Sequence, residues 1–116
     1  MALFPPDELE ALLILRAQQR QSISYGAVFE WFGIPFQRFQ VGQLCAALTE
    51  IDQRQRGQDR PELAVLVVRQ SDGLPGQGWW IEKNAAAWNG PITGPDARAY
   101  VCQIQNRTYD WWEEHG

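Results

Sequence analysis

Two amphipathic segments separated by a glycine and a proline constrain the fold of this chain more than any other feature. Residues 25–32 and residues 37–56 each place apolar side chains at helical spacing. Gly33 suits a left-handed position at a helix end, and Pro35 cannot continue a helix, so the chain must turn between the two segments. Two helices joined by a short turn are typical of a helix-turn-helix, although any tight helical corner gives a similar pattern.

Two further helices are expected near the ends of the chain. Prolines and carboxylates at residues 5–8 are typical of a helix start, and leucines then recur at helical spacing over residues 7–19. A final helix is predicted over residues 96–112. The 116 residues and the 45% hydrophobic content predict one globular domain that spans residues 1–116.

The central part of the chain predicts a β-hairpin. Residues 63–68 are a continuous, mostly β-branched run that is typical of a buried strand. A glycine-rich loop at residues 71–78 and a second strand at residues 79–82 complete the expected hairpin, and residues 84–88 are predicted as a short helical turn. The sequence therefore predicts an α+β, winged helix-turn-helix-like fold with three N-terminal helices, a hairpin and a C-terminal helix.

Composition narrows the functional classes. The formal net charge of −4 counts against generic nucleic-acid binding, because phosphate contacts usually need an excess of cations, although a local patch can be basic. No apolar run approaches the roughly 20 residues that span a bilayer, so no membrane partner is expected. A basic segment followed by an apolar stretch is also missing at the N-terminus, which predicts no signal peptide and a cytoplasmic protein.

Histidine and cysteine usage predicts neither a catalytic triad nor a metal site. The single histidine, His115, lies one residue from the end, where a side chain is rarely held in a fixed geometry. Cys45 and Cys102 are too few for a disulfide scaffold and too far apart for a metal knuckle. Both cysteines are expected to be small buried apolar residues.

Only one arrangement of residues invites an enzymatic hypothesis. Glu62, Glu82 and Lys83 flank the predicted hairpin and are the residue types that a magnesium-dependent nuclease uses. The loop at residues 73–78 lacks the lysine and the helix start of a phosphate-binding loop. The sequence predicts a protein that is not an enzyme and has no cofactor.

Tryptophan is abundant, and its six copies are spread along the chain. Each indole can bury about 150–250 Å². Most of them are therefore expected in the core, with an outward-facing member of the pairs at residues 79–80 and 111–112 as a possible contact surface. The tryptophans are Trp31, Trp79, Trp80, Trp88, Trp111 and Trp112.

Three short motifs resemble a known DNA repair family. They are Ile-Ser-Tyr-Gly at residues 23–26, Phe-Gln-Val-Gly at residues 39–42 and the segment from Leu to Leu at residues 66–74. The chain resembles the C-terminal domain of the alkylguanine–DNA alkyltransferases and their alkyltransferase-like relatives over residues 22–76. In that family a Thr-Tyr-Gly segment opens the first helix of a helix-turn-helix, and an Arg-Ala-Val-Gly segment starts the recognition helix.

The departures from that family concern its chemistry. Ala64 and Val65 stand where the family carries its alkyl-accepting cysteine and the neighbouring histidine, so the resemblance implies DNA binding without alkyl transfer. Phe39 falls at the position of the intercalating arginine, with Arg38 beside it. Tyr25 matches the tyrosine that contacts the phosphate backbone.

A second resemblance covers nearly the whole chain. Small uncharacterised bacterial proteins share a Thr-Tyr-Gly helix start, an Ala-Leu-Val-Val strand, a Gly-Leu-Pro-Gly loop and a final helix that ends in tryptophan. The corresponding segments here are residues 24–26, 65–68, 73–76 and 109–112. This resemblance implies no activity.

The first functional hypothesis is a non-catalytic domain that binds double-stranded DNA. The third helix would enter the major groove, where glutamine pairs with adenine and arginine with guanine. The predicted hairpin tip at residues 72–77 would follow the backbone. These polar side chains are equally compatible with a plain solvated helix face. The candidate DNA-binding residues are Tyr25, Gln37, Arg38, Phe39, Gln40 and Gln43.

The second hypothesis belongs to another class. The same fold would serve as a protein-interaction module, such as an accessory, inhibitor or immunity-type protein. Its contacts would come from the acidic terminal helix and from exposed tryptophans. The net charge favours this hypothesis, and the family resemblance favours DNA.

Overall fold

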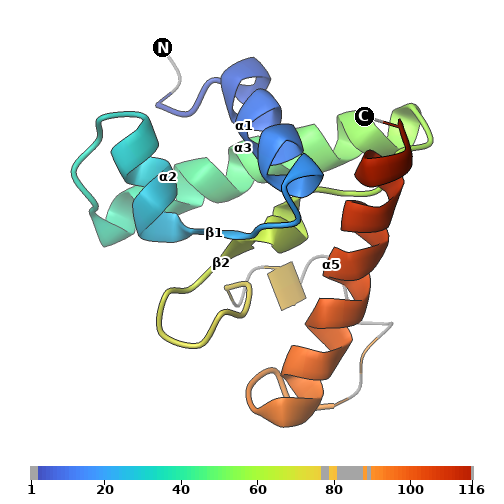
Figure 1. Cartoon of the computed structure of the whole chain (residues 1–116). Helices are drawn as coiled ribbons and strands as arrows, with labels where there is room; N and C mark the ends of the chain where they lie inside the picture. Colours follow the sequence, from blue (N-terminus) through green and yellow to red (C-terminus); the bar gives the residue numbers. More distant parts are fainter. Residues whose placement is uncertain (1–2, 77–78, 81–87, 89, 116) are drawn as a thin grey trace.

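The computed structural model describes residues 3–76, 79–80, 88 and 90–115, and it has an α+β architecture (Figure 1). A minimal sheet lies among helices of very different lengths. None of the described helices combines the length and the apolarity that crossing a membrane requires. In chain order the elements are α1 (Pro6–Gln18), β1 (Ile23–Ser24), α2 (Tyr25–Trp31), η1 (Arg38–Gln40), α3 (Val41–Gly57), η2 (Ala64–Leu66), β2 (Val67–Val68) and α5 (Pro95–His115).

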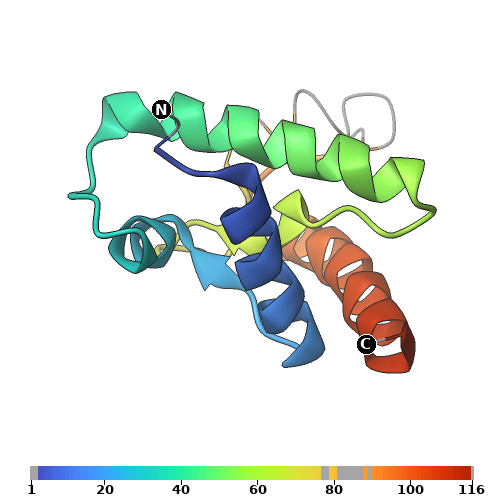
Figure 2. The same ribbon diagram turned by 90° about the horizontal axis from the view of Figure 1, so that it is seen from above.

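Helix α1 lies between α3 and α5 and forms the centre of the core (Figure 2). Its leucines at positions 9 and 13 and its alanine at position 17 are fully buried, as the helical spacing predicts. Beyond its C-terminal end, Arg20 forms ion pairs with Asp110 and Glu113 of α5, at 2.9 and 2.8 Å. These pairs are exposed to solvent, so the packing of the helices stabilises the fold more than they do.

The helix boundaries follow local signals closely. Helices α1 and α5 match the predictions within one residue at the start, and α5 continues three residues beyond the expected end. Ser24 caps α2, because its Oγ accepts a hydrogen bond from the Ala27 backbone N–H at 3.1 Å. Gly33 adopts the left-handed conformation expected after the helix, with φ of +68°.

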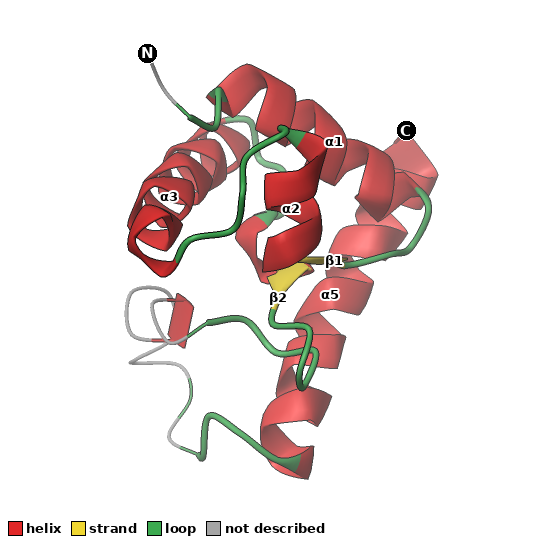
Figure 3. Ribbon diagram, turned by 90° about the vertical axis from the view of Figure 1, so that its left-hand side faces the viewer, coloured by secondary structure: helices red, strands yellow, loops and turns green. Residues whose placement is uncertain are grey.

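The predicted tight corner between the second and third helices is wrong. Helix α3 begins at Val41 rather than at residue 37, and an extended linker followed by η1 separates it from α2 (Figure 3). The cause is tertiary packing. The Phe36 ring lies against Phe29 with 4.9 Å between centroids, and Gln37 is extended at φ −140°. Helix α3 therefore begins at Val41, beyond the segment that the Phe36–Phe29 contact holds extended.

The predicted β-hairpin is also wrong. Strand β2 pairs in parallel with β1, so that Ile23 lies opposite Val67 and Ser24 opposite Val68. Trp79 and Trp80 are helical, and the rest of the expected second strand and residues 84–87 of the expected helical turn lie outside the described residues. The run at residues 63–68 is entirely buried, as predicted, but only its last two residues form a strand.

A buried carboxylate explains why this run begins as a 3-10 turn. Asp52 of α3 has no exposed surface, and its Oδ1 accepts hydrogen bonds from the backbone N–H groups of Leu63 and Ala64 at 2.9 and 3.0 Å. These N–H groups are therefore not available to a β-ladder. Burial, with a smaller contribution from the Glu62 carboxylate, raises the pKa of Asp52 to about 7, against the lowering effect of the two backbone bonds.

This carboxyl group makes stability depend on pH. A pKa that folding raises means that the folded state holds the proton more tightly than the unfolded state does. The contribution of this group to the free energy of unfolding is therefore fully present below about pH 4 and is lost as the pH rises through about 7. Urea unfolding at about pH 5 and about pH 8 measures the difference.

The matched variant is Asp52→Asn, which keeps a carbonyl acceptor for both N–H groups but cannot ionise. We expect this variant to lose most of the stability difference between the two pH values. A variant as pH-dependent as the original protein would contradict the assignment.

The tryptophans and cysteines only partly follow expectation. Trp80 and Trp112 are buried, whereas Trp31 is 62% exposed, so the prediction that it anchors the core is wrong. Cys102 is exposed on α5 and Cys45 is half-buried, which corrects the prediction that both are buried. Val28 and Phe29 occupy the buried face of α2. Trp31 instead borders an open hollow between α1 and α2, together with Leu12 and Leu15.

Candidate interaction surface

The segment from the end of α2 to the first turn of α3, residues 31–43, is called the junction here. It holds three of the five large hydrophobic side chains that are exposed among the described residues. Trp31 is 62% exposed, Phe36 is 53% exposed and Phe39 is 77% exposed. These three side chains follow one another along one segment of the chain, and large exposed apolar side chains are candidate contact positions.

The local structure follows from how α2 ends. The backbone N–H of Ile34 donates to the Phe29 carbonyl at 2.9 Å, and that of Gly33 donates to Glu30 at 3.0 Å, which closes the helix. Pro35 then carries the chain away from α2. Phe36 covers Phe29 with part of its ring and leaves the rest in solvent. Phe39, on η1, is the most exposed of the three rings.

Charge is nearly absent from this part of the chain. Between residues 31 and 49 the only charged side chain is Arg38. Arg38 is exposed and forms no ion pair with a described residue. The junction is therefore aromatic and amide-rich with a single cation, and carries no carboxylate.

Most other arginines are engaged within the molecule. Arg16 and Arg98 donate to backbone carbonyls, and Arg60 lies over two indole rings. The arginines that form ion pairs with described carboxylates are Arg20, Arg54, Arg56 and Arg69. Few cations are consequently available for an external phosphate chain.

The structure gathers most of the predicted site residues at one end of α3. Gln37, Arg38, Phe39 and Gln43 are exposed there. Gln40 is partly buried, and its Oε1 has no hydrogen-bond partner among the described residues. Helix α5 lies at the other side of the molecule and does not cover this end (Figure 1).

Tyr25 has a structural contact. It lies in the first turn of α2, where its hydroxyl oxygen accepts a hydrogen bond from the Gly76 backbone N–H at 3.0 Å. Burial raises the pKa of Tyr25 above its ordinary value, although the bond from Gly76 lowers it. The phenol therefore remains neutral and anchors the loop that follows β2.

Several contacts hold that loop, where the sequence predicts a hairpin tip that follows the DNA backbone. Arg69 pairs with Asp72 at 2.7 Å, and Asp72 also accepts from the Leu74 backbone N–H at 3.1 Å. Arg98 of α5 donates to the Asp72 carbonyl at 2.6 Å. Gly73 takes the positive φ of +70° that this turn requires.

Metal-ligating side chains do not converge in the part of the chain that the structure describes. No group of three or more histidine, cysteine, aspartate or glutamate side chains is placed there to hold a metal ion. Ala64 and Val65, at the positions where the alkyltransferases carry their reactive residues, are buried apolar side chains.

Comparisons with protein families, with curated proteins and with solved structures find no match to this chain.

Trp31 and Phe36 are the junction residues that sequence reasoning missed. The available signal is the gap in charge between Glu30 and Glu50, broken only by Arg38, with several aromatic residues inside it. A stretch that carries aromatic residues without charges is typical of the centre of an interface as well as of a core.

The Tyr25 anchor can be tested through its neighbour. A methyl group added at Gly76 would lie 2.6 Å from the Tyr25 hydroxyl oxygen, which is too close. We expect Gly76→Ala to lower the free energy of unfolding by about 1–3 kcal/mol. In a Tyr25→Phe background the oxygen is gone, so the same substitution should cost at least about 1 kcal/mol less. If denaturant unfolding shows that Gly76→Ala lowers the free energy of unfolding equally in both backgrounds, the contact between residue 76 and the Tyr25 hydroxyl is disproved.

Proposed function

We propose that this protein is a non-catalytic protein-binding module whose contact surface is the junction. The observation that carries the proposal is the exposure of Trp31, Phe36 and Phe39 on a segment whose only charge is Arg38. This is the second of the two functional hypotheses, but its contacts come from the junction rather than from the acidic terminal helix.

The composition of the junction supports a protein partner. Aromatic residues and arginine are enriched at the centres of protein interfaces, where other charged residues are depleted. Tryptophan and arginine are also frequent among the few residues that supply most of the binding energy. Burying apolar surface contributes about 25 cal/mol per Å², so a ring as exposed as that of Phe39 has much to contribute on binding.

The partner-binding test uses matched surface variants. The protein is coupled to resin, and proteins captured from a lysate are identified and then purified to measure a Kd with the original chain. We expect Phe39→Ser to weaken that Kd at least about tenfold, because it removes a ring buried on binding. Ile92→Ser is the control, since Ile92 is an exposed apolar residue outside the junction.

The proposal fails if the purified partner binds Phe39→Ser as tightly as the original chain. It also fails if Ile92→Ser weakens binding equally, because the contact would then not be specific to the junction.

Double-stranded DNA is the second candidate ligand. The observation that favours it is that Gln37, Arg38 and Gln43 are exposed on a segment that has no carboxylate of its own, at an end of α3 that α5 leaves open. Glutamine and arginine are suited to reading bases in the major groove, and the resemblance to alkyltransferase-like proteins adds support. The engagement of most other arginines within the molecule weighs against it.

A mobility-shift titration on random duplex decides between the two candidates. A DNA-binding protein should shift the duplex at about 50 mM salt and micromolar concentration. With Arg38 as the main contact, the slope of log K against log salt should be close to about −1, and Arg38→Ala should abolish it. No shift under these conditions removes the DNA candidate and leaves the protein-binding proposal intact.

A further inference from the structure

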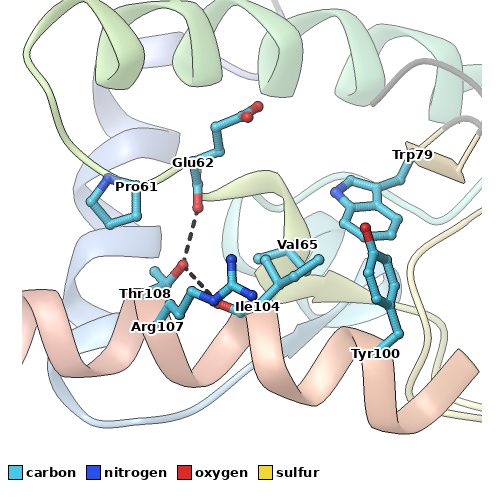
Figure 4. Close-up of a pocket in the computed structure, with 8 residues that line it drawn as sticks. All are labelled: Pro61, Glu62, Val65, Trp79, Tyr100, Ile104, Arg107 and Thr108. Carbon is cyan, nitrogen blue, oxygen red and sulfur yellow. Dashed lines mark hydrogen bonds between the residues drawn. The ribbon is translucent and has the colours of Figure 1, made fainter. Parts of the chain in front are cut away.

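A pocket of about 280 Å³ lies between η2 and α5, and no residue of the junction contributes to it (Figure 4). Its described lining residues come from the segment around η2, from α5 and from Trp79. They are Pro61, Glu62, Val65, Trp79, Tyr100, Ile104, Arg107 and Thr108.

The framework of the pocket is held by hydrogen bonds between η2 and α5. Gln105 donates to the Val65 carbonyl at 3.0 Å, and this amide is buried. The Thr108 hydroxyl lies 3.3 Å from both the Glu62 and the Ile104 carbonyl oxygens, and it can donate its one hydrogen to either. These bonds fix the floor of the pocket, where Val65 and Ile104 supply apolar surface.

One wall of the pocket is an oriented aromatic ring. Tyr100 stacks on Trp88 with centroids 4.5 Å apart and planes inclined by 19°. Trp80 stacks on the same ring at 6.0 Å. Tyr100 is therefore held in one orientation before any ligand arrives, which reduces the entropy that binding would cost.

The polar groups that face the pocket favour a negative charge. Arg107 lies on its α5 side, is exposed and forms no ion pair with any residue that the structure describes. The Trp79 indole nitrogen, which can only donate, points toward the space (Figure 4). The Glu62 carboxylate extends toward α3 (Figure 4), where Arg56 pairs with it at 3.0 Å.

We propose that this pocket binds a small planar organic anion, an aromatic carboxylate of about two fused rings. A cavity of about 150 Å³ holds benzene, so 280 Å³ suits a two-ring molecule. The guanidinium of Arg107 matches the planar, bidentate geometry of a carboxylate. The Trp79 ring, the edge of the Tyr100 ring and the apolar floor accept the rings of the ligand by burial of apolar surface. This site is separate from the junction and does not depend on its partner.

The probe is naphthalene-2-carboxylate, titrated into the full chain by calorimetry and followed by the indole N–H signals in NMR spectra. We expect a Kd below about 1 mM and a shift of the Trp79 signal, assigned with Trp79→Phe. The neutral analogue naphthalene-2-carboxamide should bind at least about tenfold more weakly, because it lacks the charge that Arg107 recognises.

Arg107→Gln should weaken binding of the carboxylate at least about tenfold, whereas Arg38→Gln removes the same charge from a distant surface and should leave the Kd unchanged. Both arginines are exposed, so both variants should fold, and circular dichroism checks this. The proposal is overturned by absence of binding at about 5 mM probe, by equal affinity for the carboxamide, or by equal weakening in the two variants.

Discussion

The position of the junction depends on one buried aromatic ring. Phe29 receives the Phe4 ring at 5.0 Å on one side and the Phe36 ring at 4.9 Å on another. The first contact fixes α2 against the N-terminal segment, and the second holds the linker extended after Gly33. Because these contacts occupy the inner side of the linker, Phe39 is left in solvent at the start of α3. The packing around Phe29 thus determines that Phe39 is exposed at the junction.

Most of the described arginines form ion pairs, hydrogen bonds or ring contacts within the molecule. Asp52 supplies the cap that starts η2, and η2 in turn supports the pocket wall on α5. Exposed arginines pair with carboxylates of neighbouring elements, as Arg54 does with Asp7 at 2.7 Å. Arg38 and Arg107 form no ion pair, side-chain hydrogen bond or ring contact with a described residue, and they lie at the two surfaces to which we assign binding. The rest of the described surface offers little free positive charge, which favours partners recognised through rings over partners recognised through phosphates.

Local signals in the sequence predict much of the fold and only part of the candidate site. The α+β class, the bounds of α1 and α5 and the cap at Ser24 follow from periodicity, dipoles and hydrogen-bonding side chains. The hairpin fails because Asp52, eleven residues away, takes the N–H groups of Leu63, and an apolar run does not reveal this. The sequence predicts the exposed polar residues at the start of α3. It places Trp31 in the core, because apolar character alone does not distinguish a buried face from a contact face.

A contact surface at the junction requires that the Phe39 ring is not needed by the core. Guanidinium unfolding of Phe39→Ser beside Phe29→Ser tests this most directly. We expect the free energy of unfolding to change by no more than about 0.5 kcal/mol for position 39, and to fall by at least about 3 kcal/mol for position 29. A loss above about 2 kcal/mol at position 39 would show that the ring stabilises the fold and would contradict the account.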